Sequence, residues 1–111
     1  MSNSVFQSVM VQLKDLTDRS FGVMDTDGCV ISCTDMSLLG ERWTDAALKV
    51  VNSSDGIVIF GQKTFKAIVN SSNYFEYAVF CTGDDEAARA YCTMAYVALN
   101  NAKVYYEEKH D

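Results

Sequence analysis

Residues 21–33 read FGVMDTDGCVISC, which is the clearest local structural signal in the chain. Two short runs of strand-forming residues, 21–25 and 29–33, flank a turn that ends in Asp27 and Gly28. Asp-Gly between two apolar runs is typical of a β-hairpin, because glycine accepts the positive φ angle that a tight turn needs. The stretch therefore predicts two antiparallel strands that begin a sheet.

Three other stretches have apolar residues at helical spacing, namely 4–18, 44–52 and about 85–108. The buried faces that this spacing predicts are Val5, Val9, Leu13 and Leu16 with Phe6 and Met10 in the first helix, Ala47, Leu48, Val50 and Val51 in the second, and Ala88, Tyr91, Ala95, Ala98, Ala102 and Tyr105 with Met94, Leu99 and Tyr106 in the third.

Three further strands are predicted at 56–60 (GIVIF), 64–69 and 74–82 (YFEYAVFCT), with a tight turn at 61–63. Residues 34–40 have no clear period and are expected to form a loop. The element order is then α-β-β-α-β-β-β-α, which predicts an α+β domain with one five-stranded antiparallel sheet.

The runs GIVIF and YAVFC (77–81) are apolar at every position. A strand with one solvated face would alternate, so both faces of the sheet are expected to be covered. The two terminal helices are assigned to one face, and the second helix with residues 34–43 to the other. The second helix and residues 34–43 will be called the roof of the sheet. The space between such a roof and the sheet is a natural place for a small-molecule pocket.

The composition limits the classes of protein that remain. The 111 residues form a single expected domain, 1–111, and the net charge of −6 does not favour binding to nucleic acid or anionic membranes. The longest apolar run, 94–99, is too short to span a membrane, and the N-terminus has no signal-peptide pattern. A cytoplasmic location is therefore expected.

The sequence contains no recognisable catalytic or metal-binding pattern. Cys29 and Cys33 lie four residues apart on one predicted strand, about 13 Å along it, which is too far to bond or chelate together. The single histidine, His110, lies near the chain end. We expect structural thiols, no metal, no cofactor, no catalytic residues and no enzymatic activity.

Cationic and aromatic residues in and near the predicted roof suggest a ligand site instead. Arg42 and Trp43 belong to the roof, Lys66 stands in the middle of a strand, and Lys63 precedes it. Converging cations can bind a carboxylate, and Tyr77 can add ring and hydroxyl contacts. The candidate ligand-binding residues are Arg42, Trp43, Lys66 and Tyr77, with a small carboxylate-bearing metabolite as ligand. The alternative is that the cations are surface charges and Trp43 fills the core.

Residues 24–31 (MDTDGCVI) resemble the first hairpin of PAS/GAF-like input domains. Together with 75–79 (FEYAV), 83–87 (GDDEA) and 106–111 (YEEKHD), they are similar to the N-terminal domains of bacterial transcriptional regulators of the purine-catabolism/sugar-diacid-utilisation type. This resemblance implies a PAS/GAF-like (profilin-like) fold and a sensory or dimerising part of a regulator, whose DNA contacts are made by a later domain. The last helix has no glycine stop, so we expect the natural chain to continue.

The expected function is therefore a signal-input domain that binds a small molecule and dimerises through its terminal helices. The same element order occurs in roadblock/longin-like modules, which bind protein partners and have no small-molecule pocket. A filled roof and sheet-edge pairing favour the roadblock/longin-like alternative. A concave interior and helix-mediated dimerisation favour the input domain.

Overall fold

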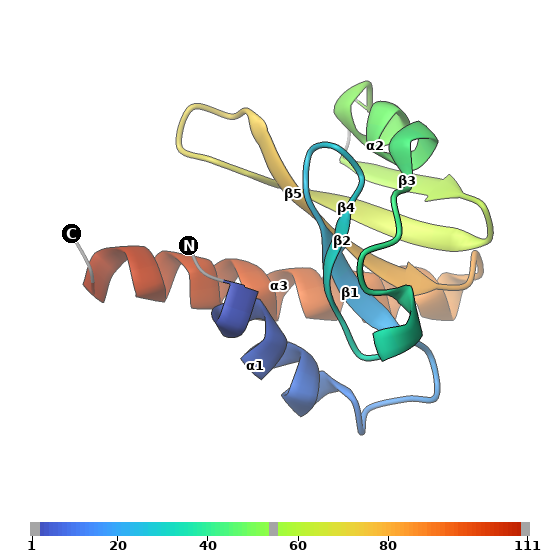
Figure 1. Ribbon diagram of the computed structural model, residues 1–111, viewed down its shortest axis with the longest axis horizontal. Coiled ribbons are helices and arrows are strands. Elements are labelled where there is room, and N and C mark those ends of the chain that lie inside the picture. The colour runs from blue at the N-terminus through green and yellow to red at the C-terminus, as the bar shows by residue number, and fades with distance from the viewer. Residues whose placement is uncertain (1–2, 54–55, 110–111) are drawn as a thin grey trace.

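The structure is a computed structural model that describes residues 3–53 and 56–109. Its elements follow in the order α1 (Asn3–Leu13), β1 (Phe21–Met24), β2 (Val30–Cys33), a short 3-10 helix η1 (Met36–Leu38), α2 (Thr44–Val51), β3 (Ile57–Phe60), β4 (Lys63–Val69), β5 (Phe75–Thr82) and α3 (Glu86–Lys109) (Figure 1). The described part of the chain is thus α+β, with a five-stranded antiparallel sheet and three α-helices, as the sequence predicted. None of its helices is long and apolar enough to cross a membrane.

The strands lie in the order β2-β1-β5-β4-β3, and β5 is central, pairing with β1 on one side and β4 on the other. The predicted first hairpin is present, and a three-residue loop, residues 26–28, connects its two strands. The Gly28 amide donates to the Asp25 carbonyl at 3.0 Å, and Gly28 has a φ of 85°. The Asp25 side chain accepts from the amides of Asp27 and Cys29. This is a type I turn followed by a left-handed residue, a common hairpin connection that requires glycine at its end.

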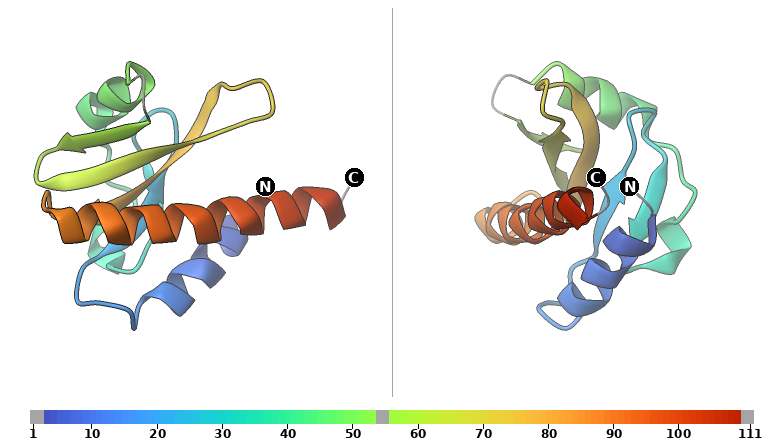
Figure 2. Two further views of the ribbon diagram at one scale, coloured as in Figure 1. Left: turned by 180° about the vertical axis from the view of Figure 1, so that it is seen from behind. Right: turned by 90° about the vertical axis from the view of Figure 1, so that its left-hand side faces the viewer.

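Helices lie on both sides of the sheet (Figure 2), and each face of the sheet carries a hydrophobic core. On one face α1 and α3 cover β1, β4 and β5, around buried residues such as Phe6, Phe21 and Leu99. On the other face α2 and the segment before it cover Phe65 and Phe80. The predicted assignment of helices to faces is confirmed.

The structure corrects several predicted buried faces. In α3 the fully buried stripe is Ala88, Cys92, Ala95 and Leu99, whereas Tyr105 is 63% exposed. The predicted buried face is turned about the helix axis relative to the observed one, because alanine and tyrosine occur on more than one side of this helix. The first helix ends at Leu13 rather than 18, because the chain leaves it to bring Arg19 toward α3, and Leu16 is exposed.

The second correction concerns α2 and β3. Ala46, Ala47 and Val50 are the buried residues of α2, while Leu48 and Val51 are 55% and 53% exposed. The prediction that 56–60 is covered on both faces was wrong, because β3 is the edge strand and its last two residues, Ile59 and Phe60, are exposed.

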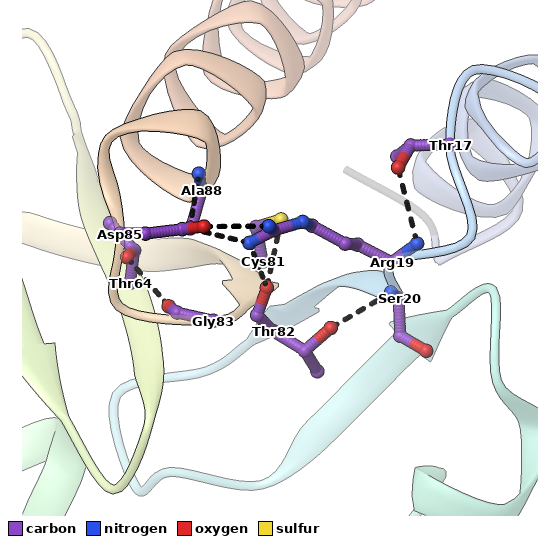
Figure 3. A network of polar contacts seen from close by, with 9 residues as sticks. All are labelled: Thr17, Arg19, Ser20, Thr64, Cys81, Thr82, Gly83, Asp85 and Ala88. Carbon is purple, nitrogen blue, oxygen red and sulfur yellow. Dashed lines mark hydrogen bonds and ion pairs between the residues drawn. The ribbon is translucent and has the colours of Figure 1, made fainter.

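A polar network joins the connection before β1 to the start of α3 (Figure 3). The Arg19 guanidinium donates to both carboxylate oxygens of Asp85, at 2.6 and 2.8 Å, and more weakly to the Thr82 carbonyl. Asp85 also accepts from the Ala88 amide at 3.0 Å, which caps α3. Gly83 has a φ of 110°, and a Cβ there would overlap the Arg19 guanidinium, so this position requires glycine for two reasons.

The Arg19–Asp85 pair predicts an acid-dependent loss of stability. The hydrogen bond from Arg19, with that from the Ala88 amide, lowers the pKa of Asp85 from its ordinary value of 3.8 to about 2. A carboxylate with a lowered pKa in the folded state stabilises the fold above 3.8, and this contribution is lost as pH falls from 3.8 toward 2. Asp85→Asn should therefore lower the free energy of unfolding at neutral pH, and the difference from wild type should vanish toward pH 2.

The effect is expected to be modest, because 55% of the Asp85 side chain is exposed and water screens the pair. Urea unfolding across this pH range measures it, with Asp84→Asn as the neighbouring exposed control. A difference between wild type and Asp85→Asn that does not change with pH would contradict the assignment.

Candidate functional site

Side chains fill the space between the sheet and the segment that leads into α2. Leu38, Leu39 and Trp43 pack onto the core of this face. The Trp43 ring lies 4.7 Å from the Phe80 ring at an interplanar angle of 70°, and 6.2 Å from the Phe65 ring. Edge-to-face contacts of this kind are stabilising beyond the area they bury. The space where the sequence suggested an enclosed ligand pocket is thus occupied by the protein itself.

The backbone of Gly28 fixes the position of Trp43. The Trp43 amide donates to the Gly28 carbonyl at 2.8 Å, and a Cβ on Gly28 would overlap the Trp43 carbonyl. The Trp43 indole donates to the Glu41 carboxylate at 2.9 Å. The first hairpin therefore determines where α2 begins and where the indole lies.

The structure separates the four predicted ligand-binding residues. Arg42 and Trp43 line an open pocket of about 320 Å³ beside the start of α2. Lys66 lies on the opposite face of the sheet, with its Nζ 4.6 Å from the Tyr96 ring centre in α3. Tyr77 is on that same face, where its ring lies 4.9 Å from Phe6. The four side chains do not converge on one site.

Lys63 takes the place beside Trp43 that the sequence prediction gave to Lys66. Its Nζ lies 4.7 Å from the Trp43 ring centre, and the residue lines the 320 Å³ pocket. Successive strand residues face opposite sides, so Lys63 shares a face with the core residue Phe65 and Lys66 does not. Counting from Phe65 along the sequence would have placed Lys63, and not Lys66, on the face of the sheet that carries Trp43.

The pocket has apolar walls and a charged rim. The rings of Trp43, Phe60 and Phe65 line it, together with Arg42, Lys63 and Asp45. Within the described ranges 3–53 and 56–109, neither of the two cations forms an ion pair. A site with this lining can hold a small anion whose body is apolar.

The two edges of the sheet differ. The outer side of β2 is covered, because the Val30 amide donates to the Glu41 carbonyl at 2.8 Å and the Gly40 amide donates to the Val30 carbonyl at 2.9 Å. No described strand pairs with the outer side of β3. A strand edge that has no neighbouring strand can serve as a template for pairing with another chain.

Apolar side chains accompany this open edge. The exposed side chains of Leu48, Val51 and Phe60 will be called the α2–β3 surface, whereas Ile59, the preceding residue of β3, faces the other side of the sheet. Leu48 and Phe60 line one open groove of about 640 Å³, which continues across Asp45, Lys49 and Asn52. Exposed apolar groups that gather at one place mark interaction surfaces more often than scattered ones do.

The thiols offer little chemistry. Burial raises the pKa of Cys81 to about 11 and that of Cys92 to about 12, and burial also raises the pKa of Cys33. These thiols are protonated at neutral pH and are poor nucleophiles. In the described ranges no three His, Cys, Asp or Glu side chains lie close enough together to hold a metal, and His110 lies outside those ranges.

Removing the Trp43 ring tests its role in the core. We expect Trp43→Ala to lower the free energy of unfolding by about 2 kcal/mol, less than for a fully buried ring because Trp43 is half-buried. Trp43→Phe should retain much of the stability, and Leu48→Ala, at an exposed position, should change it little. Urea unfolding followed by circular dichroism measures all three. Unchanged stability in Trp43→Ala would mean that the indole is not part of the core.

Comparison of the chain with protein-family models, with curated proteins and with solved structures finds no significant match.

Proposed function

We propose that this chain is a protein-interaction module that pairs with a second copy of itself through β3 and α2. The observation that carries the proposal is the open edge of β3 beside the exposed apolar α2–β3 surface. The filled roof supports it, because Trp43, Leu38 and Leu39 occupy the place that an enclosed ligand would need. These two features together favour the roadblock/longin-like alternative that the element order raised.

The register of β3 supports pairing at its edge. Gly61 and Gln62 have φ angles of 59° and 61°, which is the two-residue type I′ turn of a hairpin. In such a hairpin Phe60 and Val58 exchange hydrogen bonds with β4, and the backbone groups of Ile59 point away from it. An antiparallel strand can therefore add beside Ile59 without disturbing the sheet.

The strand is only four residues long, but it lacks two other features that protect edges. Proteins commonly place charges or proline on an exposed edge strand to prevent pairing. The sequence of β3 is IVIF, with neither. In the single chain, the apolar area beside this edge is exposed to solvent. A partner strand and helix would cover it.

The charges of α2 match a second copy in a two-fold arrangement. Asp45 and Lys49 are both exposed and line the same groove as Leu48. When two α2 helices meet antiparallel about a two-fold axis, Asp45 of one copy approaches Lys49 of the other. The surface is thus complementary to itself in both apolar groups and charge.

The input domain of a transcriptional regulator is the second candidate function, as a PAS/GAF-like sensor. The pocket bordered by Arg42, Lys63 and Trp43 favours it. In this candidate the terminal helices would form the dimer, and an open groove of about 580 Å³ between α1 and α3, lined by Val9, Ala98 and Tyr105, is the surface available for it.

Charge substitutions distinguish the two candidates. Leu48→Lys should convert a dimer to a monomer, with affinity weakened roughly tenfold or more, because it places a charge in the apolar centre of the pairing surface. Tyr105→Lys, at a 63% exposed position in the groove between α1 and α3, and Val11→Lys, at a 63% exposed position of α1 outside that groove, should leave the dimer intact. Sedimentation equilibrium measures the association, and circular dichroism shows that each variant remains folded.

A monomeric wild-type chain at all accessible concentrations would refute self-pairing. Dissociation by Tyr105→Lys but not by Leu48→Lys would favour the terminal-helix dimer of an input domain.

A further inference from the structure

We propose that the 320 Å³ pocket between Trp43, Phe60 and Phe65 binds a small aromatic carboxylate, with Arg42 and Lys63 holding the carboxylate group. This site differs from the one the sequence suggested, because it uses Lys63 in place of Lys66 and lies at the rim of the roof rather than beneath it. The inference does not depend on self-pairing, because Arg42 and Lys63 lie outside the surface proposed for pairing, although Phe60 and Asp45 belong to both.

The charge distribution favours an anion at this place. The chain has 15 acidic and 9 basic residues, so two basic residues that line one pocket are a local excess of positive charge in an acidic chain. Arg42 and Lys63 both line this pocket, and among the described residues neither has an ion-pair partner. A planar guanidinium can bind both oxygens of a carboxylate at once, whereas a lysine ammonium adds a point charge.

The acidic groups nearby limit the charge of the ligand. Asp45 is the one carboxylate in the lining, and the Glu41 carboxylate beside the pocket accepts the hydrogen bond of the Trp43 indole. Two cations against one acid leave a net charge of about +1 in the lining. This balance suits a monoanion better than a dianion or a phosphate.

The walls select the body of the ligand. Trp43, Phe60 and the buried Phe65 are among the lining residues, and the Lys63 ammonium lies over the Trp43 ring at 4.7 Å. A volume near the lower limit for ligand pockets, about 300 Å³, admits a compound of one ring. A ring stacked on these walls with its carboxylate at the rim satisfies both the apolar and the charged parts of the lining.

Trp43 is the only tryptophan of the chain, so its fluorescence reports on this pocket alone. Titration with sodium benzoate should give a saturable change in Trp43 emission. Neutral benzamide and sodium acetate should each bind at least about tenfold more weakly, since the first lacks the charge and the second lacks the ring. Isothermal titration calorimetry provides a reading that does not depend on the indole.

Matched variants locate the charge contacts. Arg42→Gln and Lys63→Gln should each weaken benzoate binding by about tenfold, a loss typical of one charge-assisted contact. Lys66→Gln, on the opposite face, and Lys49→Gln, outside the pocket, should leave it unchanged. Repeating the titration in Leu48→Lys, at a position outside the lining, separates this inference from self-pairing.

No saturable response to benzoate would overturn the inference, as would equal binding of benzamide or equal effects of Lys66→Gln and Lys63→Gln. Binding that persists in Leu48→Lys would support the pocket even when the self-pairing proposal fails.

Discussion

The contact between the Trp43 ring and Phe80 determines the arrangement of one whole face of the sheet. Phe80 belongs to the central strand, and Trp43 is the residue before α2, so their edge-to-face contact places the helix over the sheet. The Gly28 carbonyl accepts a hydrogen bond from the Trp43 amide, so the first hairpin also holds Trp43 in position. The pocket at the start of α2 and the exposed side of that helix both follow from where this ring lies.

Much of the architecture could be predicted because the relevant signals are local. The Asp27-Gly28 turn, the apolar run in β5 and the helical spacing in α3 each depend on neighbouring residues only. These signals gave the α+β class, the number of strands and the face that each helix covers.

The failures share one physical cause, which is that an apolar residue looks the same whether it faces a core or solvent. Leu48 and Val51 were expected in the core of α2, and their exposure follows from tertiary packing that the spacing does not contain. The apolar sequence of β3 suggested a central strand for the same reason, although β3 lies at an edge. At the candidate site, Arg42 and Trp43 line one pocket, while the lysine that lies beside them depends on strand register, which the sequence prediction did not take into account.

The strand order has a consequence for how the chain reaches its fold. The β1–β2 and β3–β4 hairpins are local, but neither contacts the other within the sheet except through β5. During synthesis both hairpins emerge before β5 does, so each must wait for residues 75–82 to acquire its neighbour. Pairing of β1 with β5 closes a long stretch of chain, a step that is slow because of its entropy. Late emergence of the middle strand thus delays completion of the sheet until both hairpins have been synthesised, and leaves the facing edges of β1 and β4 exposed until then.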